Sequence, residues 1–446
     1  MLLLLKQALH TMRSYMEYFS RKLMLAFAVV CLLPFFIYSE PLHLIIEGEA
    51  GILINAETGA VLFEKDVHKS LFPASTTKIA TALFALNLLE ENLETQVVAE
   101  PESLKNLSET SKIKLNYRMP GYWLEPDGTH IAIKPHEELS FQALLEGMLI
   151  ASGNDAANVI AQALGPTIPT FINKMNEFLK ENGCLETTYY NPHGLHHPKH
   201  VTTAYDLARM TALALKNPVF CEIVGKARYQ RPKTRSQPSA IFLQTNRLLR
   251  SGKYYYPHAI GVKTGYHSKS KKTFVGAARF EGRTLIAVLL GYKNKNAIFD
   301  DAIELFDKAF NQPKVEKIFL PSGLQTFTVP IARASNELTT YTDENLSLIY
   351  YPAEDPKVKC YLSWEILDLP IRKNQKVGEL QLVSFDNRVL SKVDLKALNR
   401  IDRVWPYNWI ENLKNFYRDH SFLSVFYLLC LICCIGFTYR AWLQDE

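Results

Sequence analysis

The sequence predicts an α+β protein: an antiparallel sheet beside a helical region, followed by a small all-β domain and a C-terminal membrane anchor. Hairpin patterns lie near residues 51–65 and 273–292, and helical apolar periodicity fills most of the stretch between them. Short strand-like segments separated by turns follow Pro313. Strands at both ends of a mostly helical stretch imply that the first and last strands meet in one sheet.

The N-terminal segment, residues 1–39, has the pattern of an export signal. Arg21 and Lys22 precede sixteen apolar residues, 23–38, and the small Ser39 follows them. This length suits the core of a signal peptide and is short for a membrane-spanning helix. We expect a cleaved signal peptide or an uncleaved signal anchor, and the long extension before Arg21 leaves both open.

The first globular elements are a hairpin and a helix. Residues 51–55 and 60–65 flank the turn 56–59, which is a hairpin signal. Apolar residues then recur at helical spacing over 76–89. The predicted helix therefore begins next to Ser75.

Ser75 and Lys78 form a Ser-x-x-Lys pattern at the start of this helix. One helical turn places Lys78 on the same face as Ser75, and the backbone N–H groups of a helix N-terminus suit an oxyanion. The pattern recurs at Ser111 and Ser268, in lysine-rich polar stretches that we interpret as solvated loops. Alone, it is also explained by a helix-capping serine beside a surface lysine.

The tripeptide Ser152-Gly153-Asn154 separates two helical patterns, 141–150 and 156–164. The flanking helices would hold its two polar side chains at a fixed, tight turn. The alternative is an ordinary helix-helix turn in which Asn154 or Asp155 caps the second helix. The tripeptide indicates a catalytic site only in combination with the other two motifs.

Lys263, Thr264 and Gly265 follow a short apolar run, 259–262, with strand character. Glycine leaves room for a substrate backbone alongside the strand, while the lysine and the hydroxyl can bind an anion. The alternative is a basic strand end followed by a turn, and residues 266–272 read as a polar loop. Together the three motifs supply a nucleophile, a base, a proton shuttle and a carboxylate anchor.

The remaining elements close the first domain and begin the second. Residues 273–280 and 284–292 predict another hairpin, and 297–310 predicts an amphipathic helix. Turn signals after Pro313, such as 321–323, divide short strand-like segments. We expect a small all-β domain over residues 313–400.

The three motifs resemble those of the serine penicillin-binding proteins, specifically the low-molecular-mass D-alanyl-D-alanine carboxypeptidases of the peptidase S11 family. Three further stretches are similar to that family: 190–195, 202–208 and 245–249. The resemblance is strong over roughly residues 45–310 and looser to about residue 395. It implies a β-lactamase/transpeptidase-like fold, with the carboxypeptidase domain over residues 40–312.

The resemblance also implies an activity, which is removal of the terminal D-alanine from peptidoglycan stem pentapeptides through an acyl-serine intermediate. Ser75 would be the nucleophile, Lys78 its base and Ser152 a proton shuttle. The implied substrate-binding residues are Asn154, Lys263, Thr264, Gly265, Tyr266 and Lys293. Lys78 can act as a base only if its pKa falls by about three units, through burial and the nearby charge of Lys263.

Two departures from the family pattern leave the substrate preference open. A lysine-rich segment, 267–272, stands where the family often has an Ala-Gly pair, and Lys293 stands near a family arginine. A lysine binds a carboxylate as a point charge rather than bidentately. The basic segment is expected to alter which stem peptides fit.

Other functions compete with this prediction. A DD-endopeptidase or a transpeptidase would use the same residues. A β-lactamase would need an acid that activates water, for which Glu177, Glu181 and Glu186 are the available candidates, without the expected loop pattern. A catalytically silent peptidoglycan-binding scaffold would have no need of the three motifs together. β-Lactams are the expected covalent inhibitors.

Composition excludes several partners. A net charge of +5 spread over 446 residues gives no reason to expect nucleic acid. No metal-ligand spacing occurs, and the histidines of 193–200 lie among turn signals, so we expect no metal and no cofactor.

The C-terminal segment predicts the membrane as a further partner. Residues 422–439 are eighteen uncharged residues, enough to span a bilayer, and 440–446 would be a cytoplasmic tail. An amphipathic juxtamembrane helix is expected over 401–421, with the apolar stripe Trp405, Trp409, Leu413 and Phe416. The export signal places the catalytic domain on the periplasmic side of the inner membrane.

Overall fold

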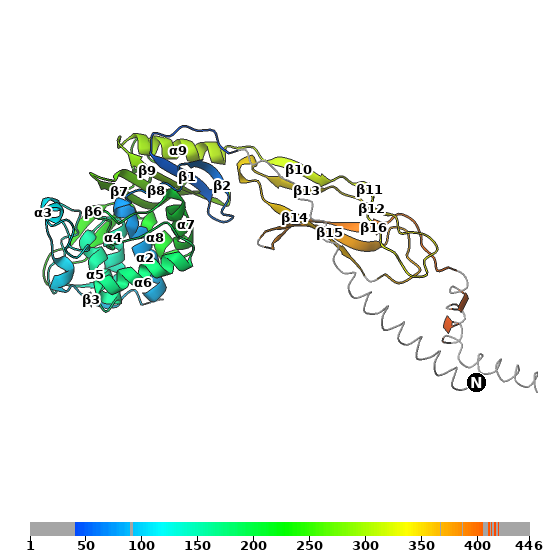
Figure 1. The fold of residues 1–446 in the computed structure, drawn as a ribbon, viewed down its shortest axis with the longest axis horizontal. Helices are drawn as coiled ribbons and strands as arrows, with labels where there is room; N and C mark the ends of the chain where they lie inside the picture. The colour runs from blue at the N-terminus through cyan, green and yellow to red at the C-terminus, as the bar shows by residue number, and fades with distance from the viewer. Residues whose placement is uncertain are drawn as a thin grey trace, which may run out of the picture. The chain divides into compact units, whose positions relative to one another are not determined.

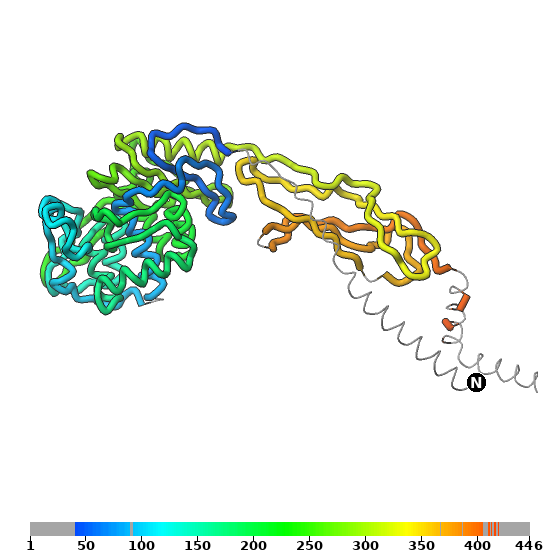
Figure 2. Tube along the Cα trace, viewed as in Figure 1, coloured from blue at the N-terminus to red at the C-terminus, as the bar shows by residue number. Residues whose placement is uncertain are grey.

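The computed structural model of the chain describes residues 41–89, 92–365, 367–385 and 387–404, with single positions between 409 and 418. The described residues form two compact units, traced in Figure 2. One lies within Tyr38–Lys314 and Tyr350–Asp355, and the other within Val315–Ile349 and Pro356–Glu446.

A five-stranded antiparallel sheet forms the centre of the first unit (Figure 1). Its strand order is β2 (Val61–Lys65), β1 (Ala50–Asn55), β9 (Arg283–Tyr292), β8 (Lys271–Phe280) and β7 (Ala259–His267). Leu53 of β1 lies opposite Ala287 of β9, which confirms that the first and last strands meet. Strand β7 stands at one edge of the sheet, so one side of its backbone is not covered by another strand.

Helices cover both faces of this sheet, as Figure 1 shows. One face packs on α9 (Ala297–Phe310), the amphipathic helix that the sequence predicts. The other face packs on the helical region, which comprises α2 (Lys78–Leu89), α4 (Phe141–Leu149), α5 (Asn154–Leu164), α6 (Ile168–Glu181), α7 (Ala204–Ala214) and α8 (Pro218–Gly225). Helix α2 is buried on nearly all sides, and only Asn87 and Leu88 are exposed. Apart from Lys78 and Asn87, its residues are small or apolar.

Smaller elements complete the first unit. Two short strand pairs lie outside the main sheet: β3 (Gln96–Val98) with β4 (Glu138–Ser140), and β5 (Arg228–Arg231) with β6 (Ala240–Leu243). The single-turn and short helices are η1 (Ala74–Thr77), η2 (Pro101–Leu104), α3 (Glu109–Lys114), η3 (Arg247–Leu249) and η4 (Pro352–Glu354).

Two local predictions are wrong. Ser111 lies in helix α3 rather than in a loop, because Ser108 accepts a hydrogen bond from the Ser111 backbone N–H and caps that helix. The predicted polar loop 266–272 is mostly strand, since Tyr266 pairs with Lys272 and only a short turn joins β7 to β8. Strand pairing outweighs the polar composition there because one face of both strands is buried.

Up to residue 404, the described part of the second unit is built of strands and turns. It contains β10 (Val315–Leu320), β11 (Gly323–Gln325), β12 (Thr340–Thr342), β13 (Leu346–Tyr350), β14 (Val358–Trp364), β15 (Lys376–Ser384) and β16 (Val389–Ala397). Five of them form a sheet in the order β11-β12-β16-β15-β14, around a core that includes Leu346, Ile371 and Leu395.

Most of the predicted export and anchor segments lie outside the described residues. These are 1–39, 422–439, 440–446 and most of 401–421. Within the last range, 401–404 is extended and not helical, because Ile401 bridges Ile371 and Arg403 bridges Ala334, whereas the described positions 409, 410, 412, 414, 415 and 418 are helical. Within the described part of the chain, none of the helices has both the length and the apolar content needed to cross a bilayer.

Candidate active site

Ser75 lies on η1, a single 3₁₀ turn that leads directly into α2. The turn is held by short side-chain contacts: Thr76 Oγ1 donates to the Pro73 carbonyl at 2.8 Å, and Thr77 Oγ1 donates to the Ala74 carbonyl at 2.9 Å. Ala74 has φ of 51°, in the left-handed region that a β-carbon disfavours. Backbone strain of this kind persists only where the surroundings fix it, and it holds Ser75 half-buried at the helix start.

Lys78 is fully buried beside Ser75. Its Nζ lies 3.0 Å from Ser75 Oγ, 2.7 Å from Asn154 Oδ1 and 2.7 Å from the His193 carbonyl oxygen. The first and second sequence motifs therefore meet at one nitrogen atom.

Burial lowers the pKa of Lys78 well below its ordinary 10.5, and the charge of Lys263 lowers it further, while Asp155 opposes the shift. Burial also lowers the pKa of Lys263, to about 7. Two ammonium groups in one water-poor site repel each other, and Lys78 is the one subject to both effects. The site thus favours a neutral Lys78 beside a Lys263 that retains much of its charge.

The second motif forms a buried turn between α4 and α5. Ser152 is 5% exposed and has φ of 65°, again in the left-handed region. The next-but-one residue, Asn154, starts α5, and its backbone N–H donates to the Thr129 carbonyl at 2.8 Å. The turn is therefore fixed from the helical region, and it brings the Asn154 amide oxygen to Lys78 Nζ; Ser152 lies in the same turn, and its role stays a prediction.

Asp155 anchors the same turn to a neighbouring segment. Its carboxylate accepts hydrogen bonds from the backbone N–H groups of Ile131 and Ile133, each at 3.0 Å. Burying a carboxylate is costly unless it accepts such hydrogen bonds. Sequence reasoning saw Asp155 only as a potential cap, although a charged residue next to Asn154 in an apolar helix is an available signal.

The third motif lies on the edge strand β7. Lys263 is fully buried and its Nζ donates to the Thr264 carbonyl at 3.0 Å. Thr264 Oγ1 donates to Thr245 Oγ1 at 2.7 Å. A β-carbon at Gly265 would lie 2.4 Å from Thr273 Oγ1 and 2.9 Å from the backbone nitrogen of Ser75. Glycine is therefore required where β7 passes the nucleophile turn.

The loop 191–195 closes the site from the helical side, and sequence reasoning assigned it no role. The backbone carbonyl of His193 contacts Lys78, and its ring makes two further contacts. Ring Nδ1 accepts from the Leu195 N–H, and ring Nε2 lies 3.0 Å from the Tyr122 carbonyl oxygen. The pKa of His193 is well below 6.5, chiefly through burial, so the ring is neutral with its proton on Nε2. A β-carbon at Gly194 would lie 1.8 Å from the Ala74 carbonyl oxygen.

His200 supports the nucleophile turn from behind. Its Nδ1 accepts from the Tyr190 N–H at 2.9 Å, and its Nε2 lies 2.8 Å from Thr77 Oγ1. Since Thr77 donates to Ala74, the ring must donate from Nε2, and burial holds the pKa of His200 at about 3. His200 is thus a neutral hydrogen-bonding residue in the core.

Two predicted binding residues lie at the margin of this group. Tyr266 follows Gly265 on β7, is 62% exposed, and has Lys272 Nζ 3.4 Å from its ring centroid. Lys293 is exposed just beyond the end of β9, and β8 lies between β9 and β7. The structure does not bring Lys293 into contact with the buried group, so its role stays a prediction.

The assembled groups suit attack by a hydroxyl on a carbonyl. A serine oxygen lies at hydrogen-bond distance from an amine of lowered pKa, which is the arrangement of an activated nucleophile. A second cation and an uncovered strand edge stand beside it. Neither a cofactor nor a metal is needed for this chemistry.

Comparisons with known proteins agree with this arrangement. A family model described as D-alanyl-D-alanine carboxypeptidase matches residues 37–294. The chain is 30% identical to the D-alanyl-D-alanine carboxypeptidase DacF of Bacillus subtilis over 370 residues, covering 78% of this chain and 86% of the relative.

Two solved structures are also similar. A D-alanyl-D-alanine carboxypeptidase from Mycobacterium tuberculosis has 29% identity and a TM-score of 0.52, covering 62% of this chain and 96% of that one. The carboxypeptidase DacD of Francisella tularensis has 20% identity and a TM-score of 0.56, covering 82% and 96%, which shows a shared fold.

Proposed function

The chain belongs to the D-alanyl-D-alanine carboxypeptidase family, and from that premise we propose which residues perform the reaction. The protein is a serine-type carboxypeptidase that removes the terminal D-alanine of peptidoglycan stem pentapeptides through an acyl enzyme. The observation that carries the residue assignment is the fully buried Lys78, whose Nζ lies 3.0 Å from Ser75 Oγ.

A neutral Lys78 can serve as the base because of how its contacts are arranged. Asn154 Oδ1 and the His193 carbonyl can only accept hydrogen bonds, so they take the two N–H groups of a neutral amine. The remaining lone pair then faces Ser75 Oγ and accepts its proton as the oxygen attacks the carbonyl carbon. Lys78 thus turns a weak nucleophile into a strong one.

The edge of β7 provides the substrate-binding surface. A peptide can add to an uncovered strand edge through main-chain hydrogen bonds. Lys263 and Thr264 would hold the terminal carboxylate, and the missing side chain at Gly265 lets β7 pass against the backbone of Ser75, beside which the scissile residue would lie. The N–H groups of Ser75 and Tyr266 would stabilise the oxyanion, since Gly265 lies against the Ser75 nitrogen.

Ser152 completes the proposed proton path. From its buried turn it would relay the proton from Lys78 to the leaving amine of D-alanine, whose loss leaves an ester on Ser75. Water then attacks the ester, releasing the shortened peptide and restoring the Ser75 hydroxyl. β-Lactams would acylate the same oxygen and block this second step.

The structure weakens the β-lactamase alternative. Glu177 and Glu181 lie exposed on α6, and Glu186 is exposed and pairs with His68 at 2.7 Å. These three carboxylates were the proposed acids for activating a deacylating water. Their positions give none of them a contact with the Ser75 and Lys78 pair in the described structure.

The finer organisation of the chain is also a proposal. It comprises a signal or signal anchor over 1–39, the catalytic domain over 40–312, a small β domain over 313–400, and an anchored end. The amphipathic and membrane-spanning segments support attachment to the outer face of the inner membrane. Truncation after residue 421 is expected to release the protein from the membrane pellet in fractionation. Unchanged pelleting would contradict the anchor.

Mass spectrometry of the intact protein with a β-lactam, followed by peptide mapping, tests the mechanism. We expect one adduct, on Ser75, and none on the Ser75→Ala variant. A folded protein that gains no adduct, or a variant that still releases D-alanine, would overturn the assignment. Products from a pentapeptide and a crosslinked muropeptide separate carboxypeptidase from endopeptidase or transpeptidase action.

A further inference from the structure

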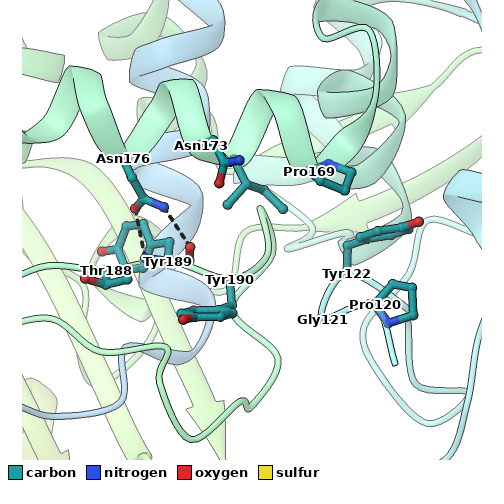
Figure 3. Close-up of a pocket in the computed structure, with 10 residues that line it drawn as sticks. Pro120, Gly121, Tyr122, Pro169, Asn173, Asn176, Thr188, Tyr189 and Tyr190 are labelled. Carbon is teal, nitrogen blue, oxygen red and sulfur yellow. Dashed lines mark hydrogen bonds between the residues drawn. The ribbon is translucent and has the colours of Figure 1, made fainter. Parts of the chain in front are cut away.

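A pocket of about 430 Å³ lies on the helical side of the first unit, between α6 and the segments 120–122 and 188–190. Figure 3 shows Pro169 and Asn173 of α6 on one side of this pocket, and Tyr122, Pro120 and Tyr190 across from them. None of the residues that line it carries a charge. A charged ligand would lose its hydration there without gaining a counter-charge.

Some polar groups of the pocket serve the fold. Asn176 exchanges hydrogen bonds with the backbone of Tyr189 at 2.8 and 2.9 Å, as the dashed lines in Figure 3 show, and Tyr122 Oη donates to Glu102 at 2.9 Å. Asn173 and Thr188 differ from these: both are exposed, and within the described structure their side chains have no hydrogen-bond partner. The pocket therefore combines ring faces with unused neutral donors and acceptors.

A continuous series of rings connects the pocket to the end of β7. His267, the last residue of β7, stacks on His196 with centroids 5.5 Å apart, and His196 contacts Tyr117 at 5.6 Å. Tyr117 contacts His197 at 5.6 Å, and His197 stacks on Tyr190 at 4.3 Å. All five rings are half-buried, so they line a surface path from the end of β7 to the pocket wall.

The direction of the substrate along β7 leads onto this path. With the terminal carboxylate at Lys263 and Thr264, the rest of the peptide runs past Gly265 toward His267. An extended chain advances about 3.3 Å per residue, so the first stem residue lies about 10 Å beyond the scissile one. In peptidoglycan that first residue is joined to an N-acetylated amino sugar, which would therefore lie at the His267 end of the series of rings, and the glycan that continues from it would extend along the series toward Tyr190.

We propose that the pocket binds an N-acetylated amino sugar of the glycan that carries the stem peptide; this inference rests on the function proposed above. Such a sugar is neutral, presents a C–H face that stacks on a tyrosine ring, and carries amide and hydroxyl groups. Tyr190 offers the ring, and Asn173 and Thr188 offer the hydrogen bonds. The site would favour substrates still attached to glycan over free peptides.

D-Alanine release is measured from a free pentapeptide and from the same pentapeptide on its N-acetylglucosamine–N-acetylmuramic acid disaccharide. We expect the wild type to prefer the second. Asn173→Ala and Thr188→Val should each raise KM for the disaccharide substrate about tenfold more than KM for the free peptide. The factor of about ten corresponds to the loss of one hydrogen bond to a neutral ligand. Lys174→Ala, an exposed neighbour on α6, is the matched control. Equal effects on both substrates would overturn the proposal.

Binding is also measured without turnover. The full-length protein, acylated with a β-lactam, is titrated calorimetrically with di-N-acetylchitobiose, and Asn173→Ala should weaken binding about tenfold relative to Lys174→Ala. Absence of binding to the wild type would refute the sugar site. If the wild type released D-alanine from neither substrate, the proposed function would fail, while calorimetry would still decide on the pocket.

Discussion

Replacing Lys263 by methionine separates the cost of burying an amine from its use in catalysis. Methionine has a similar length and no charge, so it fits the same space beside the nucleophile turn. The pKa of the fully buried Lys263 falls from its ordinary 10.5 to about 7. Unfolding returns the lysine to water and to its ordinary pKa, so the unfolded chain binds more protons over that range.

The sign and size of the effect follow from this difference. Stability rises with pH wherever the unfolded state binds more protons, so the wild type gains stability from about pH 7 up to about pH 10.5. Each pKa unit corresponds to about 1.4 kcal/mol, so the lowered pKa costs the fold up to about 4 kcal/mol near pH 7. In the variant the pKa of Lys78 rises because the neighbouring charge is gone, so the cost of burying Lys78 falls as well.

Urea unfolding of wild type and Lys263→Met at pH 7, 8, 9 and 10 measures this. The variant is expected to be the more stable at pH 7, with an advantage that shrinks by about 1 kcal/mol per pH unit, while acylation by a β-lactam is strongly slowed. Lys174→Met, at an exposed site, is the control and should show a constant difference. A pH-independent difference at Lys263 would refute the reasoning.

Three further predictions concern the nucleophile turn. Gly265→Ala should slow acylation about 100-fold in stopped-flow assays, because its β-carbon displaces the Ser75 backbone; an unchanged rate would contradict the close approach. His200→Ala should lower stability by about 2–3 kcal/mol in thermal unfolding, since it leaves the Tyr190 N–H and Thr77 without partners, and an unchanged Tm would count against that support. Acylation should fall as the pH is lowered through the depressed pKa of Lys78, because protonation removes the base; a rate that shows no fall at any acidic pH at which the protein stays folded would exclude Lys78 from that role.

Periodicity and turn chemistry were enough to predict the sheet and its helices. The hairpins around residues 56–59 and 281–283, and the helix 297–310, lie where the alternation and helical spacing place them. These signals are local, since each strand or helix must bury one face. Where composition and long-range pairing disagree, as in 266–272, the pairing with β8 prevails.

The supporting residues of the site could not be predicted in the same way. His193 contributes a backbone carbonyl to Lys78. Every residue has a backbone carbonyl, so the residue type at position 193 does not indicate this contact. His200 supports Thr77 across 123 residues of chain. The lowered pKa of Lys78 depends on its complete burial and on the charge of Lys263, both of which exist only in the folded chain.

By itself, then, the sequence determined which side chains are available for acyl transfer and the order in which they occur. Ser75 and Lys78 share one helical turn, and that short-range spacing is written in the chain. The tertiary structure alone decided that Asn154 and Lys263 meet them in a buried site. It did so because packing excludes water from the space between α2, α5 and β7, and only there does a lysine become a base.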